Sequence, residues 1–163
     1  MAKDTSRFQI WKRIIKSLNN NKLDYVLVGA AALVVHGLPR STLDVDIYLP
    51  ARTDTLVKIF GIAKALGLHS QEKDILKLSR FPKLFSNQWI SFSYKGQDIL
   101  DIFFSDEKEF IGLFKDSELK RDKNIIVRVS SLKELKKMKK ASGRPQDLAD
   151  IKLIEQTQKL RRI

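Results

Sequence analysis

The chain has 163 residues, and its 31 lysine and arginine residues against 19 acidic residues give a net charge of +12. Hydrophobic residues make up 43% of the sequence, which is ordinary for a folded domain and too high for a disordered chain. Because there is no cysteine, disulfides, zinc–thiolate sites, iron–sulfur clusters and cysteine nucleophiles are excluded.

The length predicts a single domain, residues 1–163, with a core over about 22–130 and a C-terminal helical segment over about 131–163. The longest apolar stretch, Val26 to Val35, is too short to cross a bilayer. The first residues, Met1 to Asp4, lack the apolar segment of a signal peptide. We therefore expect a cytoplasmic protein with no membrane partner.

Apolar spacing, capping residues and glycine or proline breaks divide the first half of the chain into short elements. In chain order we predict a helix from Ser6 that ends at residues 19–21, a strand at 25–28, a short helix at 30–36, a strand at 43–49 and a helix at 53–66. For residues 68–88 we predict only one weak strand and a loop around Phe81-Pro82.

The second half contains a predicted hairpin, in which strands at 89–94 and 98–104 flank the turn at 95–97. The remaining predicted elements are a helix at 106–114, a strand at 125–129, a helix capped by Ser131 and Glu134, and a last helix from Pro145 with Leu148, Ile151 and Ile154 on one side. This mixture of helices, strands and an antiparallel hairpin predicts an α/β (α+β) domain with a mixed sheet.

The positive charge is concentrated in the C-terminal part. Residues 119–163 contain 14 basic and 5 acidic side chains, a net charge of +9, whereas residues 1–118 have a net charge of +3. Such clustering suggests an anionic partner, either nucleic acid or nucleotide phosphates. A solvated, lysine-rich helix has the same pattern, so charge alone does not separate the two interpretations.

Two aspartates, Asp44 and Asp46, lie on one face of the predicted 43–49 strand because side chains alternate along a strand. Carboxylates this close repel each other, and a divalent cation with its preference for oxygen ligands removes the repulsion. Gly29, where the preceding strand breaks into a helix, could present backbone N–H groups to an anion. The two features together suit a magnesium–nucleotide complex; an exposed strand face or two salt bridges would also explain the aspartates.

A third carboxylate is available on the predicted strand at 98–104. Asp98 and Asp101 are three positions apart, so regular alternation places them on opposite faces. Asp101 is in mid-strand between Leu100 and Ile102, where an acid is costly to bury without a partner, whereas Asp98 adjoins the turn. We therefore choose Asp101 as the third acid.

These motifs follow one another in a characteristic order over roughly residues 25–154. They are Gly29-Ala30, His36-Gly37, Arg40-x-Thr42, Asp44-x-Asp46, Leu100-Asp101-Ile102-Phe103, Leu135-x-x-Met138-Lys139 and Gly143-Arg144-Pro145-x-Asp147-Leu148-x-Asp150-Ile151. The set resembles the polymerase-beta-type nucleotidyltransferase superfamily, in particular the small prokaryotic nucleotidyltransferases related to abortive-infection toxins of type IV toxin–antitoxin systems.

The resemblance implies that Asp44, Asp46 and Asp101 ligate Mg²⁺ or Mn²⁺, with Asp101 as third ligand or base. It also implies transfer of a nucleoside monophosphate from a nucleoside triphosphate to an acceptor hydroxyl, with release of pyrophosphate. The acceptor could be an RNA or tRNA end, a protein side chain or a small antibiotic-like alcohol, and RNA, tRNA or another protein could also be a partner. The candidate nucleotide-binding residues are Gly29, Ala30, Arg40, Ser41, Thr42, Lys139 and Arg144.

One position departs from the family pattern. The family commonly has Gly-Ser or Gly-Gly where this chain has Gly29-Ala30, and alanine keeps the backbone N–H but lacks a hydroxyl, which Ser41 or Thr42 could supply instead. Two other hypotheses therefore stay open: an inactive nucleotide- or RNA-binding module on the same fold, within a toxin–antitoxin pair, and a generic basic RNA-binding domain. The two histidines have no metal-ligand spacing, and we expect His36 to pack or to make one hydrogen bond near the loop.

Overall fold

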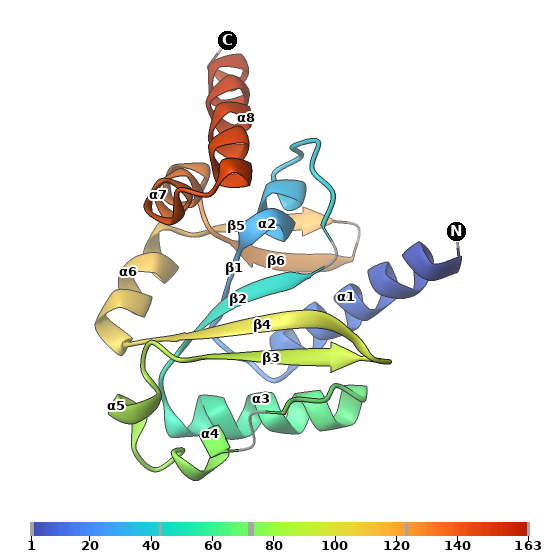
Figure 1. Ribbon diagram of the computed structural model, residues 1–163, viewed down its shortest axis with the longest axis vertical. Coiled ribbons are helices and arrows are strands. Elements are labelled where there is room, and N and C mark those ends of the chain that lie inside the picture. Colours follow the sequence, from blue (N-terminus) through green and yellow to red (C-terminus); the bar gives the residue numbers. More distant parts are fainter. Residues whose placement is uncertain (1, 43, 72–73, 123, 163) are drawn as a thin grey trace.

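The computed structural model describes residues 2–42, 44–71, 74–122 and 124–162. Within these ranges the chain forms a mixed six-stranded sheet and eight helices, so the predicted α/β (α+β) class is confirmed (Figure 1). Among the described residues, no helix is both long and apolar enough to cross a membrane.

The sheet is mixed because hairpins and crossovers alternate along the chain. Its strands are β1 (Val26–Val28), β2 (Val45–Pro50), β3 (Trp89–Tyr94), β4 (Gln97–Ser105), β5 (Glu118–Asp122) and β6 (Ile125–Val129), in the order β3-β4-β2-β1-β6-β5. β2 runs antiparallel to β1 but parallel to β4, and β1 runs parallel to β6. The pairs β3–β4 and β5–β6 are antiparallel.

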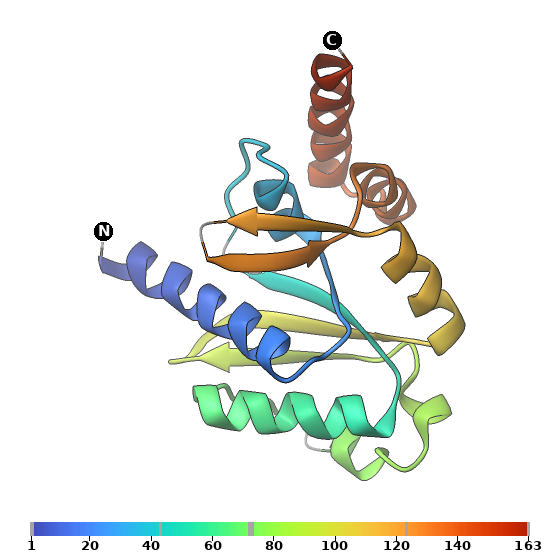
Figure 2. The same cartoon turned by 180° about the vertical axis from the view of Figure 1, so that it is seen from behind.

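The helices are distributed over both faces of this sheet. They are α1 (Ala2–Asn20), α2 (Gly29–Val35), α3 (Thr53–Leu66), α4 (Asp74–Lys77), α5 (Pro82–Phe85), α6 (Glu107–Asp116), α7 (Leu132–Ser142) and α8 (Pro145–Arg161). α1 and α3 cover one face (Figure 2), whereas α2 and α7 lie on the side of the other face, and α8 projects from the body of the protein (Figure 1).

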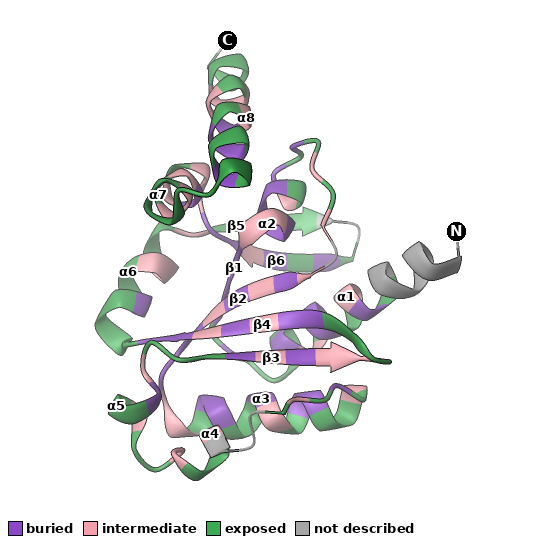
Figure 3. Cartoon of the chain, in the orientation of Figure 1, coloured by how far each residue is buried: buried purple, intermediate pink, exposed green. Residues whose placement is uncertain are grey.

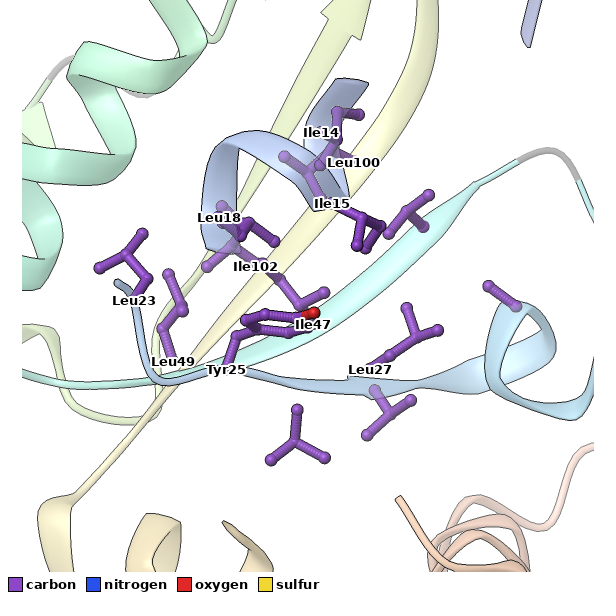
Figure 4. Packing of buried hydrophobic residues seen from close by; sticks show 14 of the residues in the cluster. Ile14, Ile15, Leu18, Leu23, Tyr25, Leu27, Ile47, Leu49, Leu100 and Ile102 are labelled. Atoms are coloured by element: carbon purple, nitrogen blue, oxygen red, sulfur yellow. The ribbon is translucent and has the colours of Figure 1, made fainter. Parts of the chain in front are cut away.

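The core lies between the sheet and α1. Apolar residues of β1, β2 and β4 form one cluster there with α1, and Figure 4 shows among them Leu27, Ile47, Ile102, Ile14 and Leu18. Each such side chain stabilises the fold by about 1.5–3 kcal/mol through burial. Alternation along β2 then leaves its polar side chains half-buried on the opposite face, which the burial colours show (Figure 3).

The element boundaries differ from the predictions in several places. α1 already begins before Ser6, whose side chain lies outside the described residues, as does Leu43 at the start of the predicted 43–49 strand. Two short helices, α4 and α5, lie within 68–88, where we predicted a weak strand and a loop, and His69 forms an isolated bridge with Ser93. β5 was not predicted, and Leu148 is 54% exposed instead of buried.

A β-bulge in the β3–β4 hairpin changes which residues of β4 share a face. Ser93 opposes Asp98, and Ser91 opposes Asp101, so three steps along β4 match two steps along β3. Ile99 is the additional residue. The prediction that Asp98 and Asp101 lie on opposite faces is therefore wrong, because it assumed unbroken alternation.

Candidate active site

The centre of the site is a pair of carboxylates on neighbouring parallel strands. Asp46 of β2 lies beside Asp101 of β4 in the strand register, and their side chains share a hydrogen bond. Asp44, just before β2, is close enough to act electrostatically on Asp46. All three side chains are half-buried, and the pairing of β2 with β4 thus brings together acids that are far apart in sequence.

Burial and the neighbouring acids raise the proton affinity of Asp46. Burial raises the pKa of Asp46 to about 7, and the charges of Asp101 and Asp44 contribute further, while Lys139 acts in the opposite direction. Without a metal, Asp46 therefore holds a proton over much of the acidic to neutral range. A divalent cation could replace that proton.

Two of the three candidate acids already offer oxygen ligands to such a cation. Among the described residues, no three His, Cys, Asp or Glu side chains are gathered closely enough to form a complete metal site. Asp46 and Asp101 nevertheless provide adjacent oxygen donors whose mutual repulsion a hard cation would relieve. The residues therefore fit Mg²⁺ or Mn²⁺, with two carboxylates already in place.

Gly29 allows the Asp46 carboxylate to approach the first turn of α2. Val28 of β1 pairs with Asp46, and Gly29 follows with φ of +72°, a conformation that favours glycine. A Cβ atom on Gly29 would lie 2.2 Å from Asp46 Oδ2, which is closer than van der Waals contact permits. A side chain at this position would therefore displace the carboxylate.

A cavity of about 240 Å³ opens beside Asp46. The sheet and α2 contribute Gly29 and Asp46 to its wall, and the α7–α8 region contributes Lys139 and Arg144. The other lining residues are Val28, Tyr48, Phe103, Leu135, Met138, Ser142 and Asp147. The fold thus brings one candidate metal ligand and three candidate nucleotide-binding residues to one cavity.

The two basic residues of the cavity differ in how far their side chains are exposed to solvent. The Nζ atom of Lys139 lies 2.8 Å from Asp150 Oδ2 and 3.4 Å from Asp147 Oδ1, and only 12% of its side chain is exposed. Arg144 donates from Nε to Asp147 Oδ2 at 2.9 Å, yet 76% of its side chain is exposed. Arg144 is therefore the better placed of the two to meet an incoming anion.

Asp147 acts as an anchor for these cations. Burial by itself raises its pKa, but hydrogen bonds from Arg144 and Ser142 outweigh this effect and lower the pKa to about 2. The carboxylate is consequently ionised at neutral pH, when it fixes the start of α8 against α7.

Four of the predicted nucleotide-binding residues are not among the described residues that line the cavity: Ala30, Arg40, Ser41 and Thr42. Arg40 instead pairs through Nε with Asp150 Oδ1 at 3.1 Å, so it shares an acid with Lys139. The Thr42 hydroxyl forms hydrogen bonds with the backbone oxygen and the backbone N–H group of Asp44, just before β2. Arg40 is thus linked to the cavity residue Lys139 through Asp150, and Thr42 is linked to Asp44.

Several residues of the site were missed at the level of sequence. Tyr48 could have been found, because alternation places it on the face of Asp46, and Phe103 lies on the corresponding face of β4. Ser91, which donates to Asp101, carried no recognisable signal. His36 packs as expected: it is buried, with Nε2 2.7 Å from the carbonyl oxygen of Ser130.

Solved structures with the same arrangement of elements were found by comparison. TM1012 of Thermotoga maritima, described as a candidate nucleotidyltransferase, matches with a TM-score of 0.61 at 15% identity, over 97% of this chain and 92% of that one. ANT(2")-Ia in complex with adenylyl-2"-tobramycin matches with a TM-score of 0.62 at 13% identity, over 94% and 89% of the two chains. The chain has the nucleotidyltransferase fold.

An antigenic nucleotidyltransferase-like protein from Paracoccidioides brasiliensis shares this nucleotidyltransferase fold, with a TM-score of 0.58 at 16% identity over 91% of this chain and 75% of that one. No protein-family model matches the chain, and no curated protein matches its sequence. Since one fold can carry several activities, the activity of this chain must be argued from its own site.

Proposed function

We propose that the protein is a Mg²⁺- or Mn²⁺-dependent nucleotidyltransferase, which moves a nucleoside monophosphate from a nucleoside triphosphate to an acceptor hydroxyl and releases pyrophosphate. The observation that carries the proposal is the register pairing of Asp46 with Asp101 beside a cavity that Lys139 and Arg144 also line. Carboxylates that bind metal, next to cations that bind phosphate, are the two requirements of this reaction.

Asp46 and Asp101 would hold the cation, and a rotation of the Asp44 side chain would add the third carboxylate. When bound, the cation would neutralise charge on the phosphates and align the attacking and leaving oxygens. Asp101 is also the candidate to accept the proton of the acceptor hydroxyl.

The basic residues would orient the triphosphate. Arg144 can offer its exposed guanidinium to two phosphate oxygens at once, and Lys139 contributes a fixed positive charge near Asp46. Gly29 keeps the adjacent backbone free of a side chain, so the Asp46 carboxylate can lie against the start of α2.

The acceptor has room beside the nucleotide. A second cavity of about 460 Å³, between α6 and α7, shares Tyr48 and Met138 with the first. ANT(2")-Ia was captured with a nucleotidylated small molecule, adenylyl-2"-tobramycin. A small alcohol is therefore one acceptor class for this chain, and an RNA or tRNA end is the other.

The second candidate function is an inactive RNA-binding module, within a toxin–antitoxin pair. It is supported by the solvent-facing lysines of α7, among them Lys133, Lys137 and Lys140. The two candidates differ in whether Asp46 and Asp101 are needed, because carboxylates repel a phosphate backbone unless a cation is bound.

One experiment tests both. The purified protein is incubated with each α-labelled nucleoside triphosphate, Mg²⁺ or Mn²⁺, and either total RNA or no acceptor, and both labelled product and pyrophosphate are measured. We expect one nucleotide to give metal-dependent transfer that Asp46→Asn and Asp101→Asn abolish. No release of pyrophosphate with any nucleotide, together with RNA binding that the two variants retain, would instead establish the inactive module.

A further inference from the structure

The Asp101 carboxylate is held by a side chain of the neighbouring strand. Ser91 of β3 donates a hydrogen bond from Oγ to Asp101 Oδ1, with 2.5 Å between the two oxygens. This distance lies in the range of strong hydrogen bonds from a hydroxyl to a carboxylate. Asp101 therefore has two side-chain partners, Ser91 on β3 and Asp46 on β2.

The contact depends on the bulge at Ile99. Counted from the turn without a bulge, Asp101 would oppose Ile90, whose side chain is fully buried in the core. The additional residue shifts the register so that Asp101 opposes Ser91 on the half-buried face. The β2–β4 register sets Asp101 beside Asp46, and the bulge brings the Ser91 hydroxyl opposite the same carboxylate.

We infer that Ser91 is a positioning residue, which orients the Asp101 carboxylate for metal binding in the transfer reaction. The inference rests on the proposed function. With one carboxylate oxygen held by the hydroxyl, Asp101 cannot rotate freely, and its remaining acceptor capacity stays directed at the cation site beside Asp46. Partners that orient a metal ligand in this way usually contribute about 10- to 100-fold to metal affinity or activity.

The chain provides a matched control on the same strand. Ser93 lies two residues further along the same face of β3 and opposes Asp98, but its hydroxyl bonds to the carbonyl oxygen of His69 at 3.4 Å. Ser91→Ala and Ser93→Ala therefore remove the same atom from the same kind of position. Ser91→Thr keeps the hydroxyl and suits a strand.

The four proteins, wild type included, are compared by Mn²⁺ binding through electron paramagnetic resonance, by the Mg²⁺ dependence of transfer, and by thermal unfolding. For Ser91→Ala we expect Mn²⁺ affinity or kcat to fall about 10- to 100-fold. Ser91→Thr and Ser93→Ala should resemble the wild type in binding and transfer, and all melting temperatures should agree within about 4 °C.

The outcomes separate this inference from the proposed function. If the wild type binds Mn²⁺ and transfers nucleotide but Ser91→Ala does so equally well, the positioning role is wrong and the proposed function stands. Equal losses in Ser91→Ala and Ser93→Ala, or a folded Ser91→Thr that is as impaired as Ser91→Ala, would also overturn it. If the wild type neither binds Mn²⁺ nor transfers nucleotide, both are wrong.

Discussion

Replacement of Asp46 by asparagine should stabilise the metal-free protein at alkaline pH, although it should abolish transfer. Burial, together with Asp101 and Asp44, raises the pKa of Asp46 from 3.8 to about 7. The folded protein therefore holds a proton that the unfolded chain has lost between about pH 4 and 7. The free energy of unfolding of the wild type consequently falls as the pH rises through this window.

The magnitude follows from the size of the shift. Three pKa units correspond to about 4 kcal/mol at 1.36 kcal/mol per unit, which is an upper limit for a pair of coupled carboxyl groups that can relax. Asparagine is neutral and can donate a hydrogen bond to Asp101, so we expect it to recover about 2 kcal/mol at pH 8. For a chain of this length, that corresponds to an increase of about 4–8 °C in the melting temperature.

The assay is thermal and urea unfolding in EDTA at pH 5 and pH 8. The gain should be large at pH 8 and small at pH 5, where wild-type Asp46 is protonated, and Mg²⁺ should stabilise the wild type more than Asp46→Asn. Asp98→Asn, an exposed acid on the same face of β4, controls for the loss of one negative charge. Destabilisation at pH 8, or an equal gain in Asp98→Asn, would refute the reasoning.

Three further changes test the supports of the site. Gly29→Ala and Gly67→Ala impose similar backbone strain, at φ of +72° and +75°, and each should lower the free energy of unfolding in urea by about 1 kcal/mol. Only Gly29→Ala should abolish Mn²⁺ binding, because only the Cβ atom at position 29 meets Asp46. Arg144→Lys keeps the positive charge but loses the planar guanidinium group, so the KM for nucleoside triphosphate should rise about tenfold while the melting temperature changes little. An unchanged KM would argue against a contact between Arg144 and phosphate. Asp150→Ala leaves Arg40 and Lys139 without this acid, so chemical denaturation should show a free energy of unfolding that is lower by about 3 kcal/mol. A much smaller loss would mean that both cations find other partners.

Regular local patterns were sufficient to predict much of the fold and part of the site. Strict alternation along β2 correctly separated the apolar residues of the core from Asp46 and Tyr48, because that strand is unbroken and one of its faces is covered by the core. The same rule failed on β4, where Ile99 adds a residue and returns Asp98 to the face of Asp101. Single-strand alternation contains no information about a bulge, since the bulge exists only in the pairing with β3.

Non-local pairing could not be derived from the residues alone. Nothing in the spacing of Asp46 and Asp101 requires β2 and β4 to lie side by side; Asp101 was chosen for its mid-strand position and for the resemblance to a family, and neither shows that the two strands pair. β5 was missed because its sequence, Glu118–Asp122, is charged and without apolar alternation, as befits a strand at the edge of the sheet. Leu148 was misplaced because the buried stripe of α8 consists of Asp147, Asp150, Ile151 and Ile154, and Leu148 lies to one side of it.

The charge of the C-terminal segment has two physically different origins. Asp147 and Asp150 of α8 hold Lys139 and Arg144 through ion pairs, so these two cations have fixed positions, and both line the cavity beside Asp46. The solvent-facing lysines of α7, such as Lys133 and Lys140, have no such role in the described cavity. A net charge of +9 counts both groups equally, although only the first group lines the cavity beside Asp46. The buried acids Asp147 and Asp150 are therefore more informative about the site than the many lysines around them, because they determine which cations face Asp46.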